Sequence, residues 1–207
     1  MAKGSPALTR ARREEIVGAC AKLYETMSFK DITIKEIAAF TSFTRPSIYN
    51  YFQTKEEIFL ALLQQEYEAW REDLDALRPE GGGAPEAEFA EGISRTLARR
   101  ERMLKLLSMN LNDMEENSRL EALTAFKAAY GSAAHALRGC LARFCPELGE
   151  QARREFLAAY LPLVYGIYPY AAVTDKQKAA MERAGVAFEA RSIYDISYLG
   201  AKKLLGV

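Results

Sequence analysis

A short polar segment in the first quarter of the chain has the residue types that hydrogen-bond to nucleic acid bases. Its spacing predicts a helix from Thr44 to Phe52, in which Ile48 and Phe52 share the inward face because residues four apart lie on one side of a helix. The outward face then carries Arg45, Pro46, Ser47, Tyr49 and Asn50. An arginine among short polar side chains suits base edges, since the major groove of B-DNA is about 12 Å wide and admits a helix.

Side chains that can bind phosphate lie beside this polar face. They are the hydroxyl groups of Tyr49 and Tyr51 and the ammonium group of Lys55. Lys55 also falls in the first turn of a predicted helix, where free backbone amides and the helix dipole favour an anion. These positions therefore predict contacts to a phosphate backbone.

The elements that must position these residues form a helix-turn-helix pattern. One helix is predicted over Thr33–Ala39, a turn over Phe40–Phe43 and the second helix over Thr44–Phe52. This spacing lets the second helix enter a major groove. The same pattern also fits a solvated three-helix subdomain, because helical hairpins are common. The spacing alone leaves both interpretations open.

The rest of the chain is also predicted to be helical. Apolar residues recur at intervals of three and four, and no segment alternates as a strand would. Helix starts are predicted by three capping boxes: Thr33 with Glu36, Thr54 with Glu57, and Ser118 with Glu121. Further helices are expected at Thr9–Met27, Thr54–Leu77, Glu86–Met109, Ser118–Phe144, Gly149–Tyr170, Thr174–Ala184 and Ser192–Leu205. The predicted fold class is all-α.

The composition and the charge distribution favour some classes of function for this protein and argue against others. The 207 residues include 28 Lys plus Arg and 28 Asp plus Glu, yet residues up to Lys55 carry a net charge of +4 and the remainder −4. A basic head on an acidic body favours a polyanion that meets the head only. Three cysteines without a C-x-x-C motif and a single histidine argue against a disulfide scaffold and a multi-histidine metal site. No catalytic constellation is present in the sequence, so we expect a non-enzyme with no cofactor and no metal.

One uncharged run, residues 156–174, is long enough to cross a bilayer. Two prolines interrupt it, and two of its four tyrosines lie in the middle, whereas tyrosine in a membrane span favours the interfaces. A helix that is apolar all round also suits a buried position, so we interpret the run as protein core. Because the N-terminus has no apolar signal-peptide region, we expect a cytoplasmic protein without membrane contact.

Three segments resemble the DNA-binding domain of the TetR family of bacterial transcriptional regulators. They are ITIKEIA at residues 32–38, FTRPSIYNYF at 43–52 and KEEI at 55–58, which occur in the family's order and spacing within about residues 10–60. The turn departs from the family pattern, because it reads Thr41-Ser42 where the family often has Ala-Gly, and serine tolerates such a turn less freely than glycine. The resemblance implies an N-terminal three-helix domain and a homodimer that binds a palindromic operator in double-stranded DNA.

The resemblance also implies a role for each part of the chain. Residues 1–54 would be the helix-turn-helix DNA-binding domain, and residues 55–207 a helical effector-binding and dimerisation domain. By analogy, bases would be contacted by Arg45, Pro46, Ser47 and Asn50. Phosphates would be contacted by Thr33, Thr44, Tyr49, Tyr51 and Lys55.

Two further sets of residues are expected in the second domain. Candidates for lining an apolar effector pocket are Trp70, Phe89, Met103, Met109, Phe126, Tyr130, His135, Tyr165 and Tyr168. For each of these the alternative is plain core packing. Candidates for the dimer interface are Ile193, Ile196, Ser197, Gly200 and Leu204, where small residues would let a partner helix approach and complete a four-helix bundle. The alternative is that this stripe packs only within its own subunit.

These expectations together predict a ligand-responsive transcriptional regulator, a repressor that a small-molecule effector releases from its operator. The alternative is a DNA-binding regulator with no small-molecule effector, controlled by a protein partner or by its own abundance.

Overall fold

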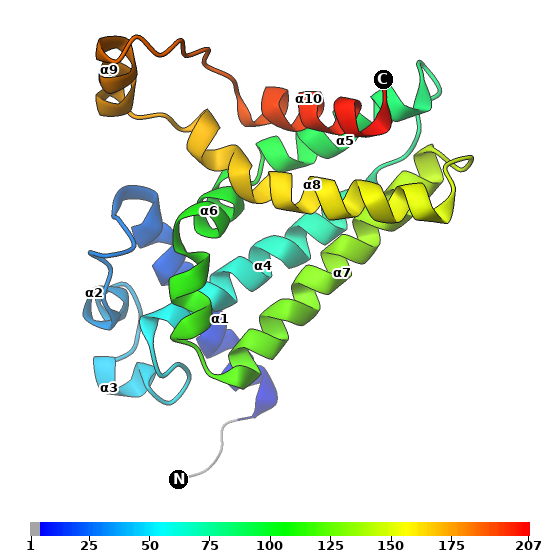
Figure 1. Ribbon diagram of the computed structural model, residues 1–207. Helices are drawn as coiled ribbons and strands as arrows, with labels where there is room; N and C mark the ends of the chain where they lie inside the picture. The colour runs from blue at the N-terminus through cyan, green and yellow to red at the C-terminus, as the bar shows by residue number, and fades with distance from the viewer. Residues whose placement is uncertain (1–4) are drawn as a thin grey trace. The chain divides into compact units, whose positions relative to one another are not determined.

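The computed structural model describes residues 5–207; the first four residues of the predicted 1–54 domain lie outside that range. The described residues form helices and no strands, which confirms the all-α prediction. The helices are α1 (Pro6–Thr26), α2 (Ile34–Ala39), α3 (Arg45–Ile48), α4 (Lys55–Ala76), α5 (Pro85–Ala98), α6 (Glu101–Glu116), α7 (Leu120–Phe144), α8 (Glu150–Ala171), α9 (Asp175–Arg183) and α10 (Ile193–Leu205) (Figure 1).

The helices group into two compact units. The first, here called the head unit, comprises residues 5–65 and 110–129, and the second, the body unit, comprises residues 66–109 and 130–207. The boundaries fall within α4, α6 and α7, so each of these helices contributes residues to both units. The head unit therefore contains a later stretch of the chain as well as the predicted DNA-binding segment. The predicted domain boundary between residues 54 and 55 stays a prediction.

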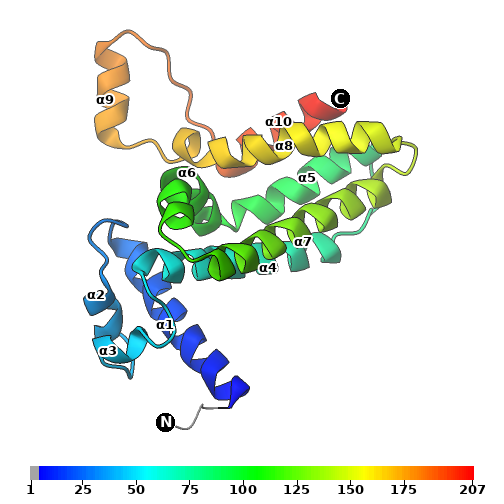
Figure 2. The same cartoon turned by 60° about the horizontal axis from the view of Figure 1, so that its bottom comes forward.

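The head unit is built around the apolar faces of its first helices. Figure 2 shows α2 and α3 next to each other beside α1, and α2 packs against both. Ile16, Ile37 and Ile48, one from each of these helices, are fully buried. Burial of such side chains contributes roughly 1.5–3 kcal/mol each, so the predicted helical faces supply the core of this unit.

The helix around Ile48 is shorter than predicted. The sequence spacing gave a helix over Thr44–Phe52, but α3 ends at Ile48 and the chain continues as tight turns. The Asn50 and Tyr51 amides donate to the carbonyls three residues back, and the Tyr51 carbonyl accepts from Arg13 Nη1 at 2.8 Å. An arginine from α1 thus binds a carbonyl that a longer helix would have used. Phe52 still reaches the core, as predicted, and is 1% exposed.

The predicted helix Glu86–Met109 is two helices, α5 and α6, separated at Arg99 and Arg100. The Arg100 amide donates to the carbonyl of Leu97, three residues back. The Arg100 guanidinium binds the Asp73 carboxylate at 2.6 Å and the Ala69 carbonyl at 3.1 Å, both on α4. The break therefore lies where a long polar side chain joins this segment to α4, a contact between distant residues that periodicity does not reveal.

The body unit has an aromatic core and a buried cluster of hydroxyl groups. Phe156 and Tyr160 on α8 stack with their ring centroids 5.1 Å apart. The Ser197 hydroxyl on α10 lies 2.7 Å from the Tyr160 hydroxyl and 2.8 Å from the Ser94 hydroxyl on α5. Each of these polar groups is hydrogen-bonded, as burial requires, and the cluster fixes α10 against α5 and α8.

No single helix among residues 5–207 is both long and apolar enough to cross a membrane; α8 and α9 meet the length and composition requirement only as a pair, and they are bent by 85° at the break between them.

Candidate nucleic-acid interface

The helix-turn-helix segment begins at a capped helix. The Thr33 hydroxyl accepts hydrogen bonds from the Lys35 and Glu36 amides at 3.2 and 3.4 Å, which caps α2 as predicted. The Glu36 carboxylate, however, accepts from the Thr33 hydroxyl instead of the backbone amide that a full capping box would use. Thr33 itself is exposed. Its cap contributes about 1 kcal/mol to the start of the helix.

The turn between α2 and α3 forms without glycine. The Thr41 hydroxyl donates to the Ala38 carbonyl at 3.0 Å and accepts from the Phe43 amide at 3.2 Å. The Ser42 amide donates to Glu15 Oε1 on α1 at 2.6 Å, and this bond lowers the pKa of the Glu15 carboxyl. No described residue other than glycine has a positive φ. Thr41-Ser42 thus makes the turn through side-chain hydrogen bonds, with no need for the left-handed conformation that glycine favours.

The predicted base-contacting residues lie together on the outer side of α3 and its following turn. Arg45, Pro46 and Asn50 are exposed and Ser47 is half-buried, whereas Ile48 between them is fully buried. Arg45 Nη2 lies 3.4 Å from the Tyr49 hydroxyl, and the exposed guanidinium group has further N–H donors. The geometry therefore presents a guanidinium group and an amide group on one exposed surface.

The predicted phosphate-contacting residues differ in their exposure and in the hydrogen bonds that they make. Thr44 and Tyr49 are exposed, and the Thr44 hydroxyl lies 2.9 Å from the Ser47 hydroxyl. The Tyr51 hydroxyl accepts from Arg12 Nη1 at 2.8 Å. The hydrogen bond from Arg12 therefore places a guanidinium group beside the predicted phosphate-contacting hydroxyl of Tyr51. Sequence reasoning counted Arg12 only as part of the basic head and gave it no role.

Lys55 has an internal role that the sequence did not indicate. Its ammonium group donates to the carbonyls of Phe29 at 2.7 Å and Ile32 at 3.2 Å, and it lies 4.5 Å from the centre of the Phe29 ring. Two of its three donors are therefore used to hold the loop between α1 and α2. The contact of Lys55 with phosphate stays a prediction and would use the third donor.

The start of α4 is held by residues from the far end of the head unit. Glu57, which is 1% exposed, accepts from Arg119 Nε at 2.6 Å and Nη2 at 2.8 Å. Thr54 caps the Glu57 amide at 3.1 Å, as predicted, but Glu57 itself accepts from the Gln53 amide and from Arg119. The predicted capping role of Ser118 is wrong, since α7 begins at Leu120 and the buried Ser118 hydroxyl makes no hydrogen bond.

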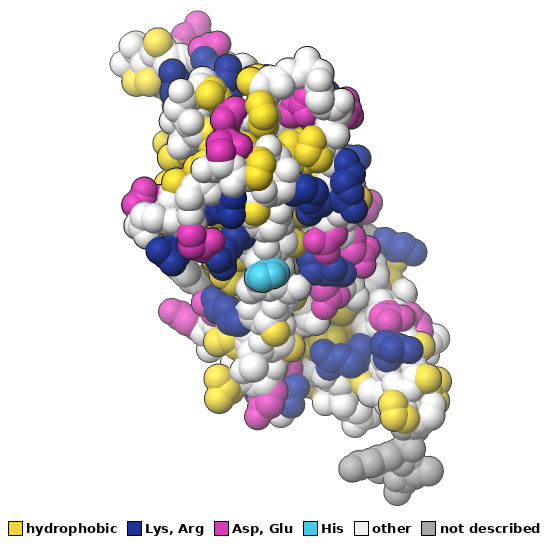
Figure 3. Space-filling model, turned by 90° about the vertical axis from the view of Figure 1, so that its right-hand side faces the viewer, with side chains coloured by type: hydrophobic (Ala, Val, Ile, Leu, Met, Phe, Trp, Pro, Cys, Tyr) yellow, Lys and Arg dark blue, Asp and Glu magenta, His cyan; other side chains and the backbone are white. Residues whose placement is uncertain are grey.

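The nine predicted pocket residues differ in burial and are divided between the two units. Trp70, Phe89 and Met103 are fully buried in the body unit, whereas Phe126 is buried in the head unit. Trp70 Nε1 donates to the Thr96 hydroxyl at 2.9 Å. Two others are on the surface: Met109 is 59% exposed, and the single histidine, His135, is exposed and visible in cyan in Figure 3. The remaining three, Tyr130, Tyr165 and Tyr168, are half-buried.

The body unit has a groove that lies apart from the nine predicted pocket residues. It has a volume of about 830 Å³ and is lined by α8, the segment around α9, and α10. None of the nine predicted pocket residues lines it, but Ile196 and Gly200 of the predicted dimer set do. The sequence did not indicate it because its walls come from three consecutive segments that fold back on one another, and each carries only part of the apolar lining.

The five residues predicted for the dimer interface differ in burial. Ser197 is fully buried and hydrogen-bonded to Tyr160, so its assignment to a dimer interface is wrong; it packs within its own subunit. Leu204 is 41% exposed, and Ile193, Ile196 and Gly200 are half-buried. A role of these four in dimerisation stays a prediction.

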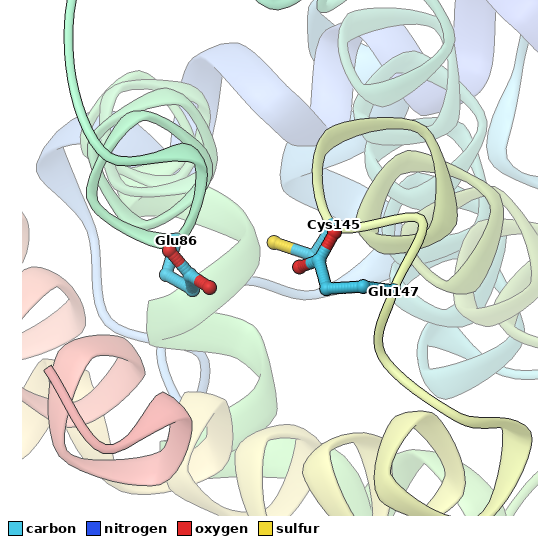
Figure 4. A group of neighbouring side chains, drawn as sticks. All are labelled: Glu86, Cys145 and Glu147. Carbon is cyan, nitrogen blue, oxygen red and sulfur yellow. The ribbon is translucent and has the colours of Figure 1, made fainter.

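Glu86 on α5 lies near Cys145 and Glu147, which follow α7, and the three ligand atoms are within 4.8 Å of one another (Figure 4). Burial raises the pKa of the Cys145 thiol to about 11, and the two neighbouring carboxylates add to this effect. Only the thiolate is a metal ligand, so a metal ion bound here would have to displace the thiol proton.

Comparison with known proteins places both parts of the chain in one group. Residues 16–62 match the family model described as bacterial regulatory proteins, tetR family, and residues 64–190 match the model described as tetracyclin repressor-like, C-terminal domain. A curated relative, the uncharacterized HTH-type transcriptional regulator YdgC of Bacillus subtilis, is 34% identical over 70 residues. That alignment covers 34% of this chain and only 36% of the relative.

Solved structures share the fold over almost the whole chain. A TetR transcriptional regulator from a Rhodococcus species has a TM-score of 0.57 and 16% identity, with 95% of this chain and 96% of that chain covered. The TetR-family transcriptional repressor FadR from Thermus thermophilus, solved with lauroyl-CoA, has a TM-score of 0.58 and 19% identity, with 93% of each chain covered. At these identities the likeness concerns the fold alone.

Proposed function

This chain belongs to the TetR family of bacterial transcriptional regulators, which is not an enzyme family, and we propose that it acts as a ligand-responsive repressor. In this proposal two copies bind one palindromic operator. Each places its α3 in a major groove, with the two helices about 34–36 Å apart, which is one turn of DNA. A small-molecule effector would then release the protein from DNA.

One observation carries the DNA-binding part of the proposal. Arg45 and Asn50 are exposed on the outer side of α3 and its turn, while Ile48 from the same segment is fully buried in the head unit. Burial of Ile48 anchors the segment, so the outward direction of its polar side chains is fixed. Arginine paired with guanine and asparagine paired with adenine are common base contacts in the major groove.

The response to an effector is supported by chain connectivity. α6 and α7 each have part of their length in the body unit and part in the head unit. Within the head unit, Tyr24 on α1 donates to Asn110 Oδ1 at 2.9 Å, and Arg119 binds Glu57 on α4. A ligand that displaces α6 or α7 would therefore act directly on contacts of α1 and α4. A coupling of about 1–3 kcal/mol would suffice for a 5- to 150-fold change in DNA affinity.

A regulator with no small-molecule effector is the second candidate, and the packing of the predicted pocket residues favours it. Trp70, Phe89 and Met103 are fully buried, and Phe89 contacts the rings of Phe144 and Phe156. These residues act as core in the described chain. In favour of an effector, FadR, which shares the fold, was solved with lauroyl-CoA. Thermal-shift measurements with a metabolite set distinguish the two candidates, since only a sensor is stabilised reproducibly by a metabolite.

Fluorescence anisotropy with a fragment of the protein's own promoter region and with random DNA tests the DNA-binding role. Arg45→Ala should weaken specific binding by about 1–3 kcal/mol if the residue pairs with guanine. Arg45→Lys is the matched variant, because it keeps the charge but loses the planar fork. We expect it to keep affinity for random DNA and to lose preference for the promoter fragment. Equal losses on both DNAs for both variants would contradict base reading by Arg45.

A further inference from the structure

A thiol and two carboxylates converge within the body unit. The Cys145 sulfur and one carboxylate oxygen from each of Glu86 and Glu147 lie within 4.8 Å of one another. Within the described residues 5–207, none of these three side chains takes part in a hydrogen bond or an ion pair. Carboxylates only accept hydrogen bonds, and a thiol is a weak donor. The cluster is therefore rich in acceptors and poor in donors, which is the composition of a cation site.

Cys145 is the fixed member of this cluster. It is fully buried, and Figure 4 shows its sulfur pointing toward Glu86. Its amide donates to the Leu141 carbonyl at 2.8 Å, and its carbonyl accepts from the Leu148 amide at 3.2 Å. A cysteine that serves as a small hydrophobe packs among apolar neighbours, whereas this sulfur faces two carboxylates. A buried, unpartnered thiol aimed at acidic groups indicates a ligand independently of the acidic groups themselves.

Aromatic packing holds the two segments of the cluster together. Phe89, one turn after Glu86, contacts Phe144, directly before Cys145, with ring centroids 5.9 Å apart. Both rings are buried. This contact fixes the first turn of α5 against the end of α7, so the spacing of the ligand groups is set by the core of the body unit.

The distances suit a tetrahedral ion of the size of zinc. Zinc binds thiolate sulfur at about 2.3 Å and carboxylate oxygen at about 2.0–2.2 Å, which puts tetrahedral ligand atoms about 3.3–3.7 Å apart. Ligand atoms that lie within 4.8 Å of one another need to close by little more than about 1 Å. Glu147 is exposed and Glu86 half-buried, so rotation of their side chains can supply this movement around the fixed sulfur.

The chemistry of the ligand set selects among cations. Thiolate favours zinc and other soft or borderline metals, whereas magnesium, calcium and manganese favour carboxylates, carbonyls and water. Calcium also takes about 6–8 oxygen ligands, far more than this cluster offers. One thiolate with two carboxylates matches the sulfur and oxygen donors that zinc accepts, and three protein ligands leave the fourth tetrahedral position to water.

We propose that Glu86, Cys145 and Glu147 bind a divalent cation of the zinc class, which joins the first turn of α5 to the segment after α7. When the ion binds, a metal–sulfur bond replaces the S–H bond of Cys145, and the proton passes to solvent. The site lies wholly within the body unit and depends neither on DNA binding nor on dimerisation. The sequence gave no sign of it, because its ligands come from segments that are far apart along the chain.

Arg153 balances the charge of the loaded site. One thiolate and two carboxylates carry one more negative charge than a divalent ion neutralises. Arg153 lies close enough to Cys145 to act against the effect of burial on the pKa of its thiol. Its Nη2 donates to the carbonyls of Cys145 at 3.3 Å and Pro146 at 2.8 Å, which keeps the guanidinium group beside the cluster.

A cobalt(II) titration of the reduced, full-length protein tests thiolate ligation, because a cobalt–thiolate bond gives a charge-transfer absorption in the near ultraviolet. Cys145→Ser removes the proposed ligand. Cys140→Ser is the matched control, since Cys140 is also fully buried but lies outside the cluster. We expect one cobalt ion per chain, with the absorption present in the unchanged protein and in Cys140→Ser and lost in Cys145→Ser. Its absence from the unchanged protein, or its persistence in Cys145→Ser, would overturn the proposal.

Glu147→Gln gives a test that does not disturb the core, because Glu147 is exposed. Glu25→Gln makes the same change at an exposed carboxylate outside the cluster. By competition with a chromophoric chelator, we expect Glu147→Gln to raise the Kd for zinc at least tenfold and Glu25→Gln to leave it within about twofold of the unchanged protein. Equal Kd values for the two variants would overturn the site, including in the case that both serine variants fail to fold.

Competition between metals tests the class of cation. An excess of calcium or magnesium, about a hundredfold over cobalt, should leave the cobalt–thiolate absorption unchanged. Displacement of cobalt by either ion would show a site dominated by oxygen ligands and overturn the assignment to the zinc class. Zinc should also raise the Tm of the unchanged protein and of Cys140→Ser, because it binds the folded chain. The same rise in Cys145→Ser would contradict binding at this cluster.

Discussion

Glu57 and Arg119 form a bidentate ion pair across 62 residues of sequence, with both guanidinium donors at 2.6–2.8 Å from the two carboxylate oxygens. The Arg119 amide also donates to Glu57 at 3.1 Å. Glu57 is 1% exposed, whereas the Arg119 side chain is 46% exposed. The pair therefore joins the start of α4 to the segment before α7 within the head unit, and it holds the helix that follows the predicted DNA-reading segment.

Glu57→Gln should lower the free energy of unfolding by about 1–3 kcal/mol, because a hydrogen-bonded buried carboxylate is replaced by an amide that cannot accept on both sides. Urea unfolding at pH 7 measures this. Glu56→Gln is the matched control, since Glu56 is the adjacent, half-buried carboxylate. Equal stability losses in the two variants would show that the pair contributes nothing specific.

The same pair predicts a pH dependence. Burial is the largest influence on Glu57 and raises its pKa, but the hydrogen bonds from Arg119 and the Gln53 amide together outweigh it and lower the pKa below the ordinary 4.5. A carboxyl whose pKa is lower in the folded state contributes stability above pH 4.5 and loses it as the pH falls through the folded value.

The Tm difference between the unchanged protein and Glu57→Gln should accordingly be largest near pH 7 and shrink below pH 4.5. Other carboxyls with a lowered pKa, such as Glu15 and Asp195, are common to both proteins and cancel in this comparison. A difference that stays constant from pH 7 to pH 3 would show that Glu57 titrates with its ordinary pKa in the folded protein.

Thr96→Val should destabilise the body unit by about 1–3 kcal/mol, because it leaves the buried Trp70 Nε1 donor without its acceptor. Trp70 is the single tryptophan of the chain, so its fluorescence reports both its surroundings and the unfolding transition. Thr96→Ser keeps the hydroxyl group and should stay close to the unchanged protein. Similar losses in both variants would assign the effect to packing of the methyl group.

Ser197→Ala should lower the free energy of unfolding by about 1–3 kcal/mol and leave the dimer Kd unchanged. The Tyr160 and Ser94 hydroxyls each lose a partner in a site that is closed to water. Urea unfolding and sedimentation equilibrium on the same samples separate the two effects. A changed dimer Kd with an unchanged free energy of unfolding would indicate that Ser197 lies in the dimer interface, and it would contradict the buried cluster.

Lys55→Met should lower stability by about 1 kcal/mol, because it removes the ammonium group from the Phe29 and Ile32 carbonyls but keeps most of the apolar stem. It should also lower affinity for promoter and random DNA alike if the third donor binds phosphate. Lys35→Met, at an exposed lysine on α2, is the control for loss of one positive charge. Unchanged DNA affinity in Lys55→Met would leave Lys55 with its internal role only.

The sequence by itself determined the elements and their inward faces. Repeats of three and four residues predicted helices wherever the apolar spacing was sustained, and Thr33, Thr174 and Ser192 cap the helices that they were expected to begin. Ile48 and Phe52 are buried as predicted. These features depend on local hydrogen bonds and on the side of a helix that a residue occupies, and both are fixed within a few residues along the chain.

Only the tertiary structure decided where helices stop and which stripes become core. Arg13 binds the Tyr51 carbonyl beyond the end of α3, and Arg100 binds α4 at the break between α5 and α6. The buried Ser197 hydroxyl is hydrogen-bonded to the Tyr160 hydroxyl. Each of these contacts joins residues that are distant in sequence, so no local pattern encodes it. Exposure of α9 is likewise a property of its surroundings, because the same nine residues would be helical whether or not another surface covers them.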